Sequence, residues 1–518
     1  MYFTVLAHGT RTPTQAKSKA YLLTDNWDDW FKYSTLYTLL VFDAEGERHI
    51  IGGVKIGQFR MADEQRRPDI PKRFDQLDER FFSLGQDDSY YDHLNELGPN
   101  VRDKVLCGIR DVALDLELFE RALKEKVTGT SLLRSVSHAT VRGQFHRMAC
   151  GGVRLSRYEF SYTAPKQSRG HINPMALAFV VEPESYPPTN IHVLIGRNGV
   201  GKTTLLNNMT RAIVEKNVDA VEVGAFSTEV EELLDNRMFT NLVSVTFSAF
   251  DPFEPLPSRQ DKSEGVQYAY IGLKRVGSGK DGKPLPPKSP ERLSTEFGSS
   301  VSVCRQGARA SRWRRALEML EADPIFREAE VADLASDDVD DEELKVQSRK
   351  LFAKLSSGHK IVLLTITRLV ETVEEKTLVL LDEPEAHLHP PLLSAFVRAL
   401  SDLLINRNGV AVIATHSPVV LQEVPKSCVW KIRRSGARAV AERPEIETFG
   451  ENVGILTREI FGLEVTHSGF HKLLRDAVAR EADFDAVVQR FGGELGGEAR
   501  AIIRALIAAR EPEDDNDR

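Results

Sequence analysis

A glycine-rich loop near the middle of the chain has the composition of a phosphate-binding site. Residues 191–204 read IHVLIGRNGVGKTT, so an apolar run leads into the loop, and a helical stretch, LLNNMTRAIV, follows it. Glycines let backbone N–H groups approach an anion, and the N-terminus of the helix adds its positive dipole end. We expect Lys202 to reach the β- and γ-phosphates of a nucleotide and Thr203 to bind Mg²⁺ through its hydroxyl group.

Two later segments place ionisable side chains at the ends of predicted strands. The apolar run 378–381 is typical of a buried strand, and Asp382 and Glu383 follow it directly; a second run, 412–414, leads to Thr415 and His416. Open α/β sheets bind ligands at the carboxyl edge of their strands. We therefore expect Asp382 to bind Mg²⁺ through water and Glu383 to orient and deprotonate the attacking water. His416 is expected to contact the γ-phosphate.

A third segment, LSSGHK at residues 355–360, precedes the apolar helix IVLLTITRLV, so Ser357 and Gly358 can meet a phosphate at a helix N-terminus.

The order of the P-loop, LSSGHK, LVLLDEPE and VAVIATHSP resembles the ABC-type ATPases. This resemblance implies an α/β fold with an ABC-type P-loop ATPase domain that binds ATP and Mg²⁺. It also implies a head-to-tail homodimer or higher homo-oligomer, in which Ser357 of one chain completes the site built on Lys202 of another. The predicted nucleotide-binding residues are Gly196, Asn198, Gly199, Gly201, Lys202, Thr203, Thr204, Ser357 and Gly358.

The segment after the predicted strand 378–381 points to one branch of these ATPases. DEPEAHLHP, residues 382–390, resembles the branch that includes the overcoming-lysogenization-defect (OLD) nucleases and the RecF-like and Septu-type ATPases. The metal site of a TOPRIM nuclease is missing from the sequence after residue 442, whereas residues 447–471 resemble the tail of Septu-type and retron-associated antiphage ATPases. We expect no metal site at His387 and His389, because no cysteine or carboxylate pair lies nearby in the sequence.

The resemblance implies a function in which the ATPase regulates a separate HNH endonuclease encoded nearby, in antiphage defence. Nucleic acid or a retron RNA–DNA complex is a further candidate partner. One alternative is a RecF-like repair ATPase that clamps DNA directly, and another is a scaffold in which ATP is structural and is not turned over.

Two features of the family pattern are not evident in the sequence. A Q-loop glutamine is expected near residues 243–251, VSVTFSAFD, and none occurs there; Ser248 and Asp251 are the candidate replacements. The aromatic residue that stacks on adenine is expected in RYEFSYT. The three candidates there are Tyr158, Phe160 and Tyr162, and we expect at least two of them to be core residues.

Composition and charge are those of an ordinary globular protein. The chain has 518 residues, 41% hydrophobic and 28% charged, which is enough for about three domains. It contains neither an uncharged apolar stretch of about 18 residues nor a signal peptide. The cysteines are isolated and fit no zinc or disulfide framework, and a cytoplasmic location without membrane contact fits all of this. They are Cys107, Cys150, Cys304 and Cys428.

Charge is unevenly distributed along the chain. The net charge of −8 argues against a general nucleic-acid coat, but residues 305–315 carry five arginines around Trp313. This cluster fits nucleic-acid contact with base stacking, and equally a solvated helix face with the tryptophan packed inward.

The motifs suggest four regions. Residues 1–150 are interpreted as an α+β region for oligomerisation or partner contact that could supply edge strands to the ATPase domain. Residues 155–446 form the ATPase domain, with a helical insertion at about 290–347 that forms an arm. Residues 447–510 form a helical C-terminal region, and residues 511–518 form an acidic tail.

Overall fold

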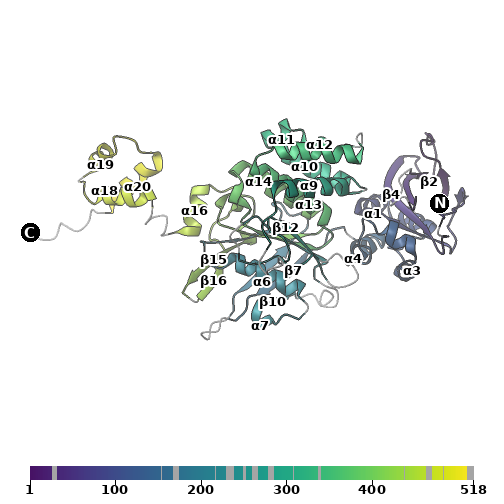
Figure 1. Ribbon diagram of the computed structural model, residues 1–518, viewed down its shortest axis with the longest axis horizontal. Helices are drawn as coiled ribbons and strands as arrows, with labels where there is room; N and C mark the ends of the chain where they lie inside the picture. Colours follow the sequence, from purple (N-terminus) through teal and green to yellow (C-terminus); the bar gives the residue numbers. More distant parts are fainter. Residues whose placement is uncertain are drawn as a thin grey trace, which may run out of the picture.

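The computed structural model describes residues 1–25, 32–62, 64–152, 154–166, 174–215, 217–228, 238–248, 252–258, 266–277, 285–306, 308–336, 340–436, 438–462, 469–481 and 483–509. Three parts follow one another along the chain: an N-terminal part that contains a sheet and helices, a central α/β unit, and a group of C-terminal helices (Figure 1). The acidic tail at residues 511–518 lies outside the described residues.

The N-terminal strands form a separate six-stranded sheet with its own core. The expectation that they add edge strands to the central sheet is wrong, because their apolar residues pack against helices of the same region. The strand order is β5 (Arg73–Phe74), β1 (Tyr2–Leu6), β2 (Lys19–Thr24), β3 (Leu36–Phe42), β4 (Arg48–Gln58) and β6 (Phe81–Gly85). The helices are α1 (Asp88–Glu96), α2 (Pro99–Ile109), α3 (Leu116–Ala122), α4 (His138–Thr140) and α5 (His146–Ala149), with π-helical turns at Thr128–Leu132 and Val141–Phe145.

The central sheet has seven strands, of which all but the last run parallel. The strands Thr377–Asp382, Val410–Thr415 and Ile191–Ile195 at its centre are buried on both faces, as expected for parallel strands covered by helices. In β13, Leu378 and Leu380 face one core while Val379 and Leu381 face the other. The strand order is β12 (Gln267–Gly272), β11 (Asn241–Thr246), β13 (Thr377–Asp382), β14 (Val410–Thr415), β9 (Ile191–Ile195), β15 (Val429–Ser435) and β16 (Arg438–Glu442).

Different elements cover the two faces. On one face lie α6 (Lys202–Val214) and an antiparallel sheet of β10 (Ala225–Ser227), β7 (Tyr158–Thr163) and β8 (Ala176–Val181), with the short α7 (Ala220–Val223) beside them. The other face is covered by α13 (Ser357–Thr372), α14 (Pro390–Ile405) and the short α15 (Pro418–Leu421). This arrangement confirms the predicted α/β fold class.

The helices before α13 pack on the sheet and do not project as an arm. Phe297, Trp313 and Phe352 lie in the same core as the strands. The helix of Phe297 packs against α13, the helix of Trp313 packs against α13 and α14, and the helix of Phe352 packs against that of Phe297. The expected arm is therefore wrong. The helices are α9 (Pro290–Cys304), α10 (Ala308–Leu320), α11 (Pro324–Glu328) and α12 (Asp341–Lys354), with a 3₁₀ turn at Val331–Ala335.

The C-terminal residues form α16 (Val453–Phe461), α18 (Gly469–Val478), α19 (Phe484–Arg490) and α20 (Gly497–Ala508). The last three share a small core that includes Leu474, Val487 and Ile503. The described part of residues 447–510 is thus mainly helical, as the sequence predicts. Among the described residues, no helix combines the length and the apolar composition that crossing a bilayer requires.

Candidate functional site

The strand order brings the three sequence motifs to one edge of the central sheet. Strand β14 lies between β13 and β9, and its register places Ala414 beside Asp382 and Thr415 beside Ile195. The P-loop that follows β9 and the side chains that follow β13 and β14 therefore leave the sheet at its carboxyl edge. This is the edge where open α/β sheets bind ligands.

Lys202 lies inside the P-loop at the start of α6. Its side chain is buried, and Nζ donates hydrogen bonds to the carbonyl oxygens of Gly196 (2.9 Å) and Arg197 (3.1 Å). Burial lowers the pKa of Lys202 from its ordinary value, while the charges of Glu383 and Asp382 oppose this shift. The loop thus holds one cation close to the carboxylates that follow β13.

Gly201 and Gly358 lie at positions where a residue with a Cβ atom would be strained or would clash. Gly201 has a φ of 103°, a conformation that residues with a Cβ rarely adopt, and it immediately precedes α6. Gly358 lies in the first turn of α13, where an added Cβ would be 2.5 Å from the carbonyl oxygen of His387. The segment after β13 therefore packs directly against the LSSGHK turn.

The other residues predicted to bind nucleotide lie in the same two turns. Asn198 and Thr204 are exposed, Thr203 is half-buried, and Gly196 and Gly199 belong to the loop itself. Ser357 is exposed as the first residue of α13.

Glu383 has a left-handed backbone, with a φ of 45°. Its N–H donates to the carbonyl oxygen of Ala414 (2.8 Å), so the strained residue is fixed against the neighbouring strand. Its Oε1 lies 3.7 Å from Nδ1 of His416. Strain of this kind costs on the order of 1–3 kcal/mol and is concentrated at functional sites. The structure therefore places the two predicted catalytic side chains next to each other.

Glu385 is a site residue that the sequence analysis missed. Its Oε1 accepts hydrogen bonds from the Thr415 hydroxyl group (2.5 Å) and the His416 N–H (2.8 Å), and it lies 3.2 Å from His416 Nδ1. The side chain is 7% exposed, so these bonds are shielded from water. Glu385 thus fixes both the backbone and the ring of His416. Its position in DEPE, two residues after the predicted catalytic carboxylate of Glu383, is the signal that could have identified it.

We expect Glu385→Ala to lower the kcat for ATP hydrolysis roughly 10- to 100-fold, the usual effect of removing a group that orients a functional imidazole. The KM for ATP is expected to change less than kcat, because the hydrogen bonds of Glu385 come from Thr415 and His416 and only its charge acts on Lys202. Glu385→Gln keeps an acceptor for Thr415 but loses the charge opposite the ring, so its kcat should be intermediate. Steady-state phosphate release measures both variants; an alanine variant with wild-type kcat would contradict this role.

Thr246 lies in the segment 243–251, where a Q-loop residue is expected. Strand β11 ends at Thr246, which is paired in register with Asp382. Thr203, Thr246 and Asp382 line one cavity. Of the two candidate replacements, Ser248 donates its N–H toward the Thr246 hydroxyl oxygen (3.4 Å), and Asp251 lies outside the described residues.

The aromatic residues of RYEFSYT do not face a nucleotide. Tyr158, Phe160 and Tyr162 are all buried in the core between α6 and the antiparallel sheet, so all three candidates for adenine stacking are core residues. A cavity of about 170 Å³ opens beside Gly201 instead. Its lining is mainly apolar, which suits a base, and includes Pro165, Pro174, Met175, Val200, Thr204, Leu205 and Arg434.

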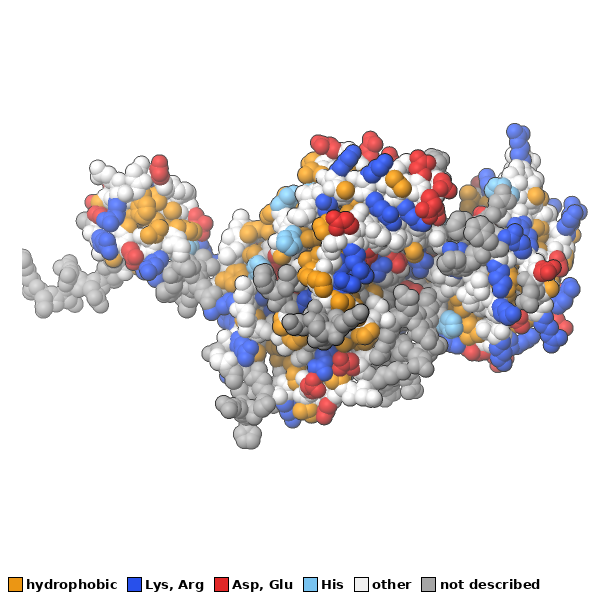
Figure 2. Space-filling model, viewed as in Figure 1, with side chains coloured by type: hydrophobic (Ala, Val, Ile, Leu, Met, Phe, Trp, Pro, Cys, Tyr) orange, Lys and Arg blue, Asp and Glu red, His pale blue; other side chains and the backbone are white. Residues whose placement is uncertain are grey.

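The basic cluster at residues 305–315 is tied to acidic partners. Trp313 is fully buried and donates its Nε1–H to the Thr367 hydroxyl oxygen (3.1 Å), so it cannot stack on a base. Arg312 pairs with Asp87 at 3.0 Å and Arg315 with Asp402 at 2.5 Å. Cationic and anionic side chains are interspersed over these helices at the top of the view (Figure 2). The packed-tryptophan interpretation is therefore the correct one.

The residues at the sheet edge fit a nucleotide with Mg²⁺. Hydroxyl and carboxylate oxygens, the ligands that Mg²⁺ prefers, line the cavity of Thr203, Thr246 and Asp382. The buried ammonium of Lys202 lies in a loop of backbone amides, as phosphate binding requires. When bound, ATP and Mg²⁺ would supply the anhydride bond and a charge to neutralise its phosphates.

Comparisons with known proteins show which proteins the chain is similar to. The family described as "AAA domain, putative AbiEii toxin, Type IV TA system" matches residues 305–422. Protein ea59 of Escherichia phage lambda is 43% identical over 526 residues, covering 98% of each chain. Among solved structures, an ATP-binding cassette of an ABC transporter is 12% identical, with 60% of this chain and 98% of that chain covered and a TM-score of 0.30. The structure of cbiO1 from Clostridium perfringens, part of the ABC transporter complex cbiONQ, is 15% identical, with 63% of this chain and 96% of that chain covered and a TM-score of 0.28. The chain belongs to the family of protein ea59, and its central unit is a mainly parallel α/β sheet that carries a P-loop sequence.

Proposed function

We propose that this protein hydrolyses ATP in a head-to-tail homodimer and that its nucleotide state restrains a separate HNH nuclease in antiphage defence. The observation that carries the ATPase part is the convergence of Lys202, Asp382, Glu383 and His416 at one sheet edge. In this site Lys202 binds the β- and γ-phosphates, and Asp382 and Thr203 hold Mg²⁺. Glu383 accepts the proton of the attacking water, while His416, oriented by Glu385, contacts the γ-phosphate.

The placement of Ser357 supports composite sites. Ser357 lies with Lys360 and His387 on the lining of a cavity of about 690 Å³, whereas Thr203 and Asp382 line a different cavity. Ser357 is exposed and begins a helix, so its hydroxyl group and the following amides are available to an anion carried by another chain. A head-to-tail dimer would bring these two surfaces together.

The regulatory part of the proposal has two supports. Residues 447–471 resemble the tail of ATPases that act with a separate HNH protein, and the family that matches residues 305–422 is described as a type IV toxin–antitoxin system. The burial of Trp313 and the pairing of Arg312 and Arg315 argue against the competing DNA-clamp function. We therefore favour control of a partner over direct DNA clamping.

Co-expression with the neighbouring reading frames tests this function. We expect the chain alone to leave nucleic acid uncut, and to co-purify with an HNH protein encoded beside it. Millimolar ATP is expected to restrain the nuclease in the complex, and removal of nucleotide with apyrase to release it.

Three controls make the result decisive. The complex carrying Lys202→Ala is expected to cut whether or not ATP is present, because it cannot bind the restraining nucleotide. An HNH active-site variant of the partner should abolish cutting. Mg²⁺-dependent cleavage by this chain alone would contradict the proposed division of labour, and ATP-dependent DNA binding without any nuclease partner would favour the DNA-clamp function.

A further inference from the structure

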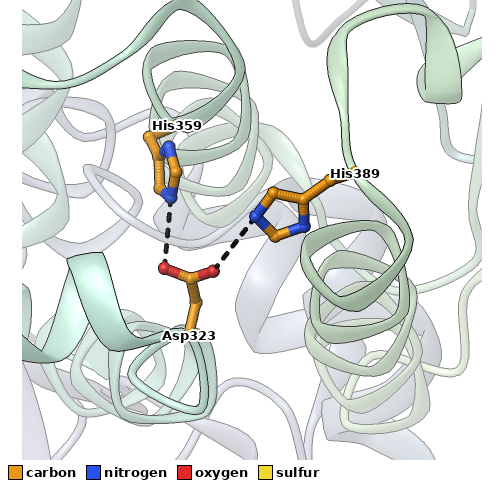
Figure 3. A group of neighbouring side chains, drawn as sticks. All are labelled: Asp323, His359 and His389. Atoms are coloured by element: carbon orange, nitrogen blue, oxygen red, sulfur yellow. Dashed lines mark hydrogen bonds and ion pairs between the residues drawn. The ribbon is translucent and has the colours of Figure 1, made fainter.

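Three side chains from distant parts of the sequence converge beside the LSSGHK turn. Asp323 caps the N-terminus of α11, His359 lies in the first turn of α13, and His389 caps α14. Figure 3 shows the two imidazole rings directed at the Asp323 carboxylate from different sides. We propose that Asp323, His359 and His389 bind a divalent transition-metal ion of the Zn²⁺ type. This site is separate from the ATP and Mg²⁺ site and does not rest on the proposed function.

The distances are close to those of a metal site. His359 Nε2 lies 3.1 Å from Asp323 Oδ1, and His389 Nε2 lies 3.7 Å from Asp323 Oδ2. One ligand atom from each residue falls within 4.8 Å of the others. Tetrahedral bonds of about 2.0–2.1 Å place ligand atoms roughly 3.4 Å apart, so a small inward movement brings all three onto one ion. Two histidines and one carboxylate leave the fourth position for water.

The charge balance favours a cation. The Asp323 side chain is 3% exposed, and its only salt-bridge partners in the described part of the chain are the two histidines. A buried carboxylate is costly to desolvate, and a cation here would add an opposite charge to the hydrogen bonds that Asp323 already accepts. The His389 side chain is 52% exposed, so the ion has a route from solvent.

Neighbouring groups orient two of the three ligands. Ser356 Oγ lies 2.6 Å from His359 Nδ1, so an Nδ1–H can donate to the serine and leave Nε2 unprotonated for the metal. The N–H groups of Ile325 and Phe326 donate to Asp323 Oδ1 at 2.9 and 3.4 Å. The carboxylate and one imidazole are therefore already held in a ligating orientation.

His389 is the ligand that must change. The Leu392 N–H donates to His389 Nδ1 (3.2 Å), which places the ring proton on Nε2. Metal ligation through Nε2 moves this proton to Nδ1 and breaks the helix-capping bond. Without a metal, the same distances allow each Nε2–H to donate to Asp323. Binding of an ion therefore shifts the first turn of α14 relative to α13 and α11.

The ion would join three segments around the LSSGHK turn. His359 follows Ser357 by two residues, and His389 lies in the segment whose carbonyl at His387 packs against Gly358. A metal here would fix the LSSGHK turn against the insertion helices and against the loop after β13. Ser357 would consequently be held in one position.

Metal binding to the full-length, untagged protein tests the site directly. Chelator-treated protein is titrated with ZnCl₂ by calorimetry, without nucleotide, and the bound metal is counted by mass spectrometry after dialysis. We expect one equivalent of Zn²⁺ per chain and a rise in Tm on binding. Co²⁺ should give the visible absorption of a low-coordinate site.

Substitutions identify the ligands. His389→Asn removes the imidazole but keeps a good helix cap, so the fold is preserved while the affinity for Zn²⁺ is expected to fall at least about 100-fold. His359→Gln should have the same effect. His387→Gln is the matched control, since His387 is an exposed histidine two residues from His389 that is not part of the cluster, and it should bind like wild type. The absence of stoichiometric binding, or binding that survives His389→Asn, would overturn the proposal.

Discussion

Replacing Lys202 with alanine is expected to weaken ATP binding by on the order of 100-fold or more. Lys202 is the buried cation of the P-loop, and hydrogen bonds to charged groups contribute about 1.5–3 kcal/mol each. The backbone amides of the loop remain, but the β- and γ-phosphates lose their cationic partner.

Binding of a fluorescent ATP analogue measures this effect. Lys426→Ala is the control, because Lys426 is an exposed lysine in the short helix Lys426–Cys428, outside the candidate site. It should bind ATP like wild type, and the melting temperature of both variants without nucleotide should be close to the wild-type value. An unchanged affinity in Lys202→Ala would remove the P-loop assignment.

Replacing Glu383 with glutamine is expected to lower kcat by about 10²–10⁴-fold while ATP binding is retained. Glutamine has nearly the same shape as glutamate but cannot accept the proton of the attacking water. Asp382 and Thr203 still hold Mg²⁺ in this variant. Glutamine must adopt the same left-handed backbone conformation at residue 383 as glutamate does. The two variants should therefore fail at different steps, Lys202→Ala in binding and Glu383→Gln in turnover.

Single-turnover hydrolysis with radiolabelled ATP distinguishes these steps. In Glu383→Gln we expect bound ATP to remain intact long after wild type has converted it. Wild-type hydrolysis by this variant would disprove the role assigned to Glu383. Intact ATP in wild type as well would favour the alternative in which ATP is structural.

The parts of the site that the sequence could predict are those formed by a strand and the loop that directly follows it. Lys202 follows β9 and Asp382 ends β13, so each motif has a local sequence pattern of its own. The parallel α/β fold then brings the carboxyl ends of these strands to one edge of the sheet. This is why the fold class was predicted correctly. The assigned roles of these residues stay predictions until the variants are measured.

Features that depend on packing between distant segments could not be predicted. The local sequence of residues 305–315 suits an exposed basic face as well as a packed one, and only the contact of Trp313 with Thr367 on α13 decides between them. Asp323 and His359 supply ligand atoms next to His389 across 66 and 30 residues of sequence. Nothing in DEPEAHLHP indicates that those partners exist.

The most direct test of the central claim is the ATP-dependent mass of Glu383→Gln protein in sedimentation velocity. Composite ATP sites require Ser357 of one chain to meet the nucleotide held by Lys202 of another, so blocked turnover should trap a dimer when ATP and Mg²⁺ are present. We predict that the single variant gains a dimer with ATP but not with ADP. Adding Ser357→Arg to it should abolish this dimer while ATP binding to the P-loop persists. An oligomeric state that does not respond to ATP, or a dimer unaffected by Ser357→Arg, would contradict the account.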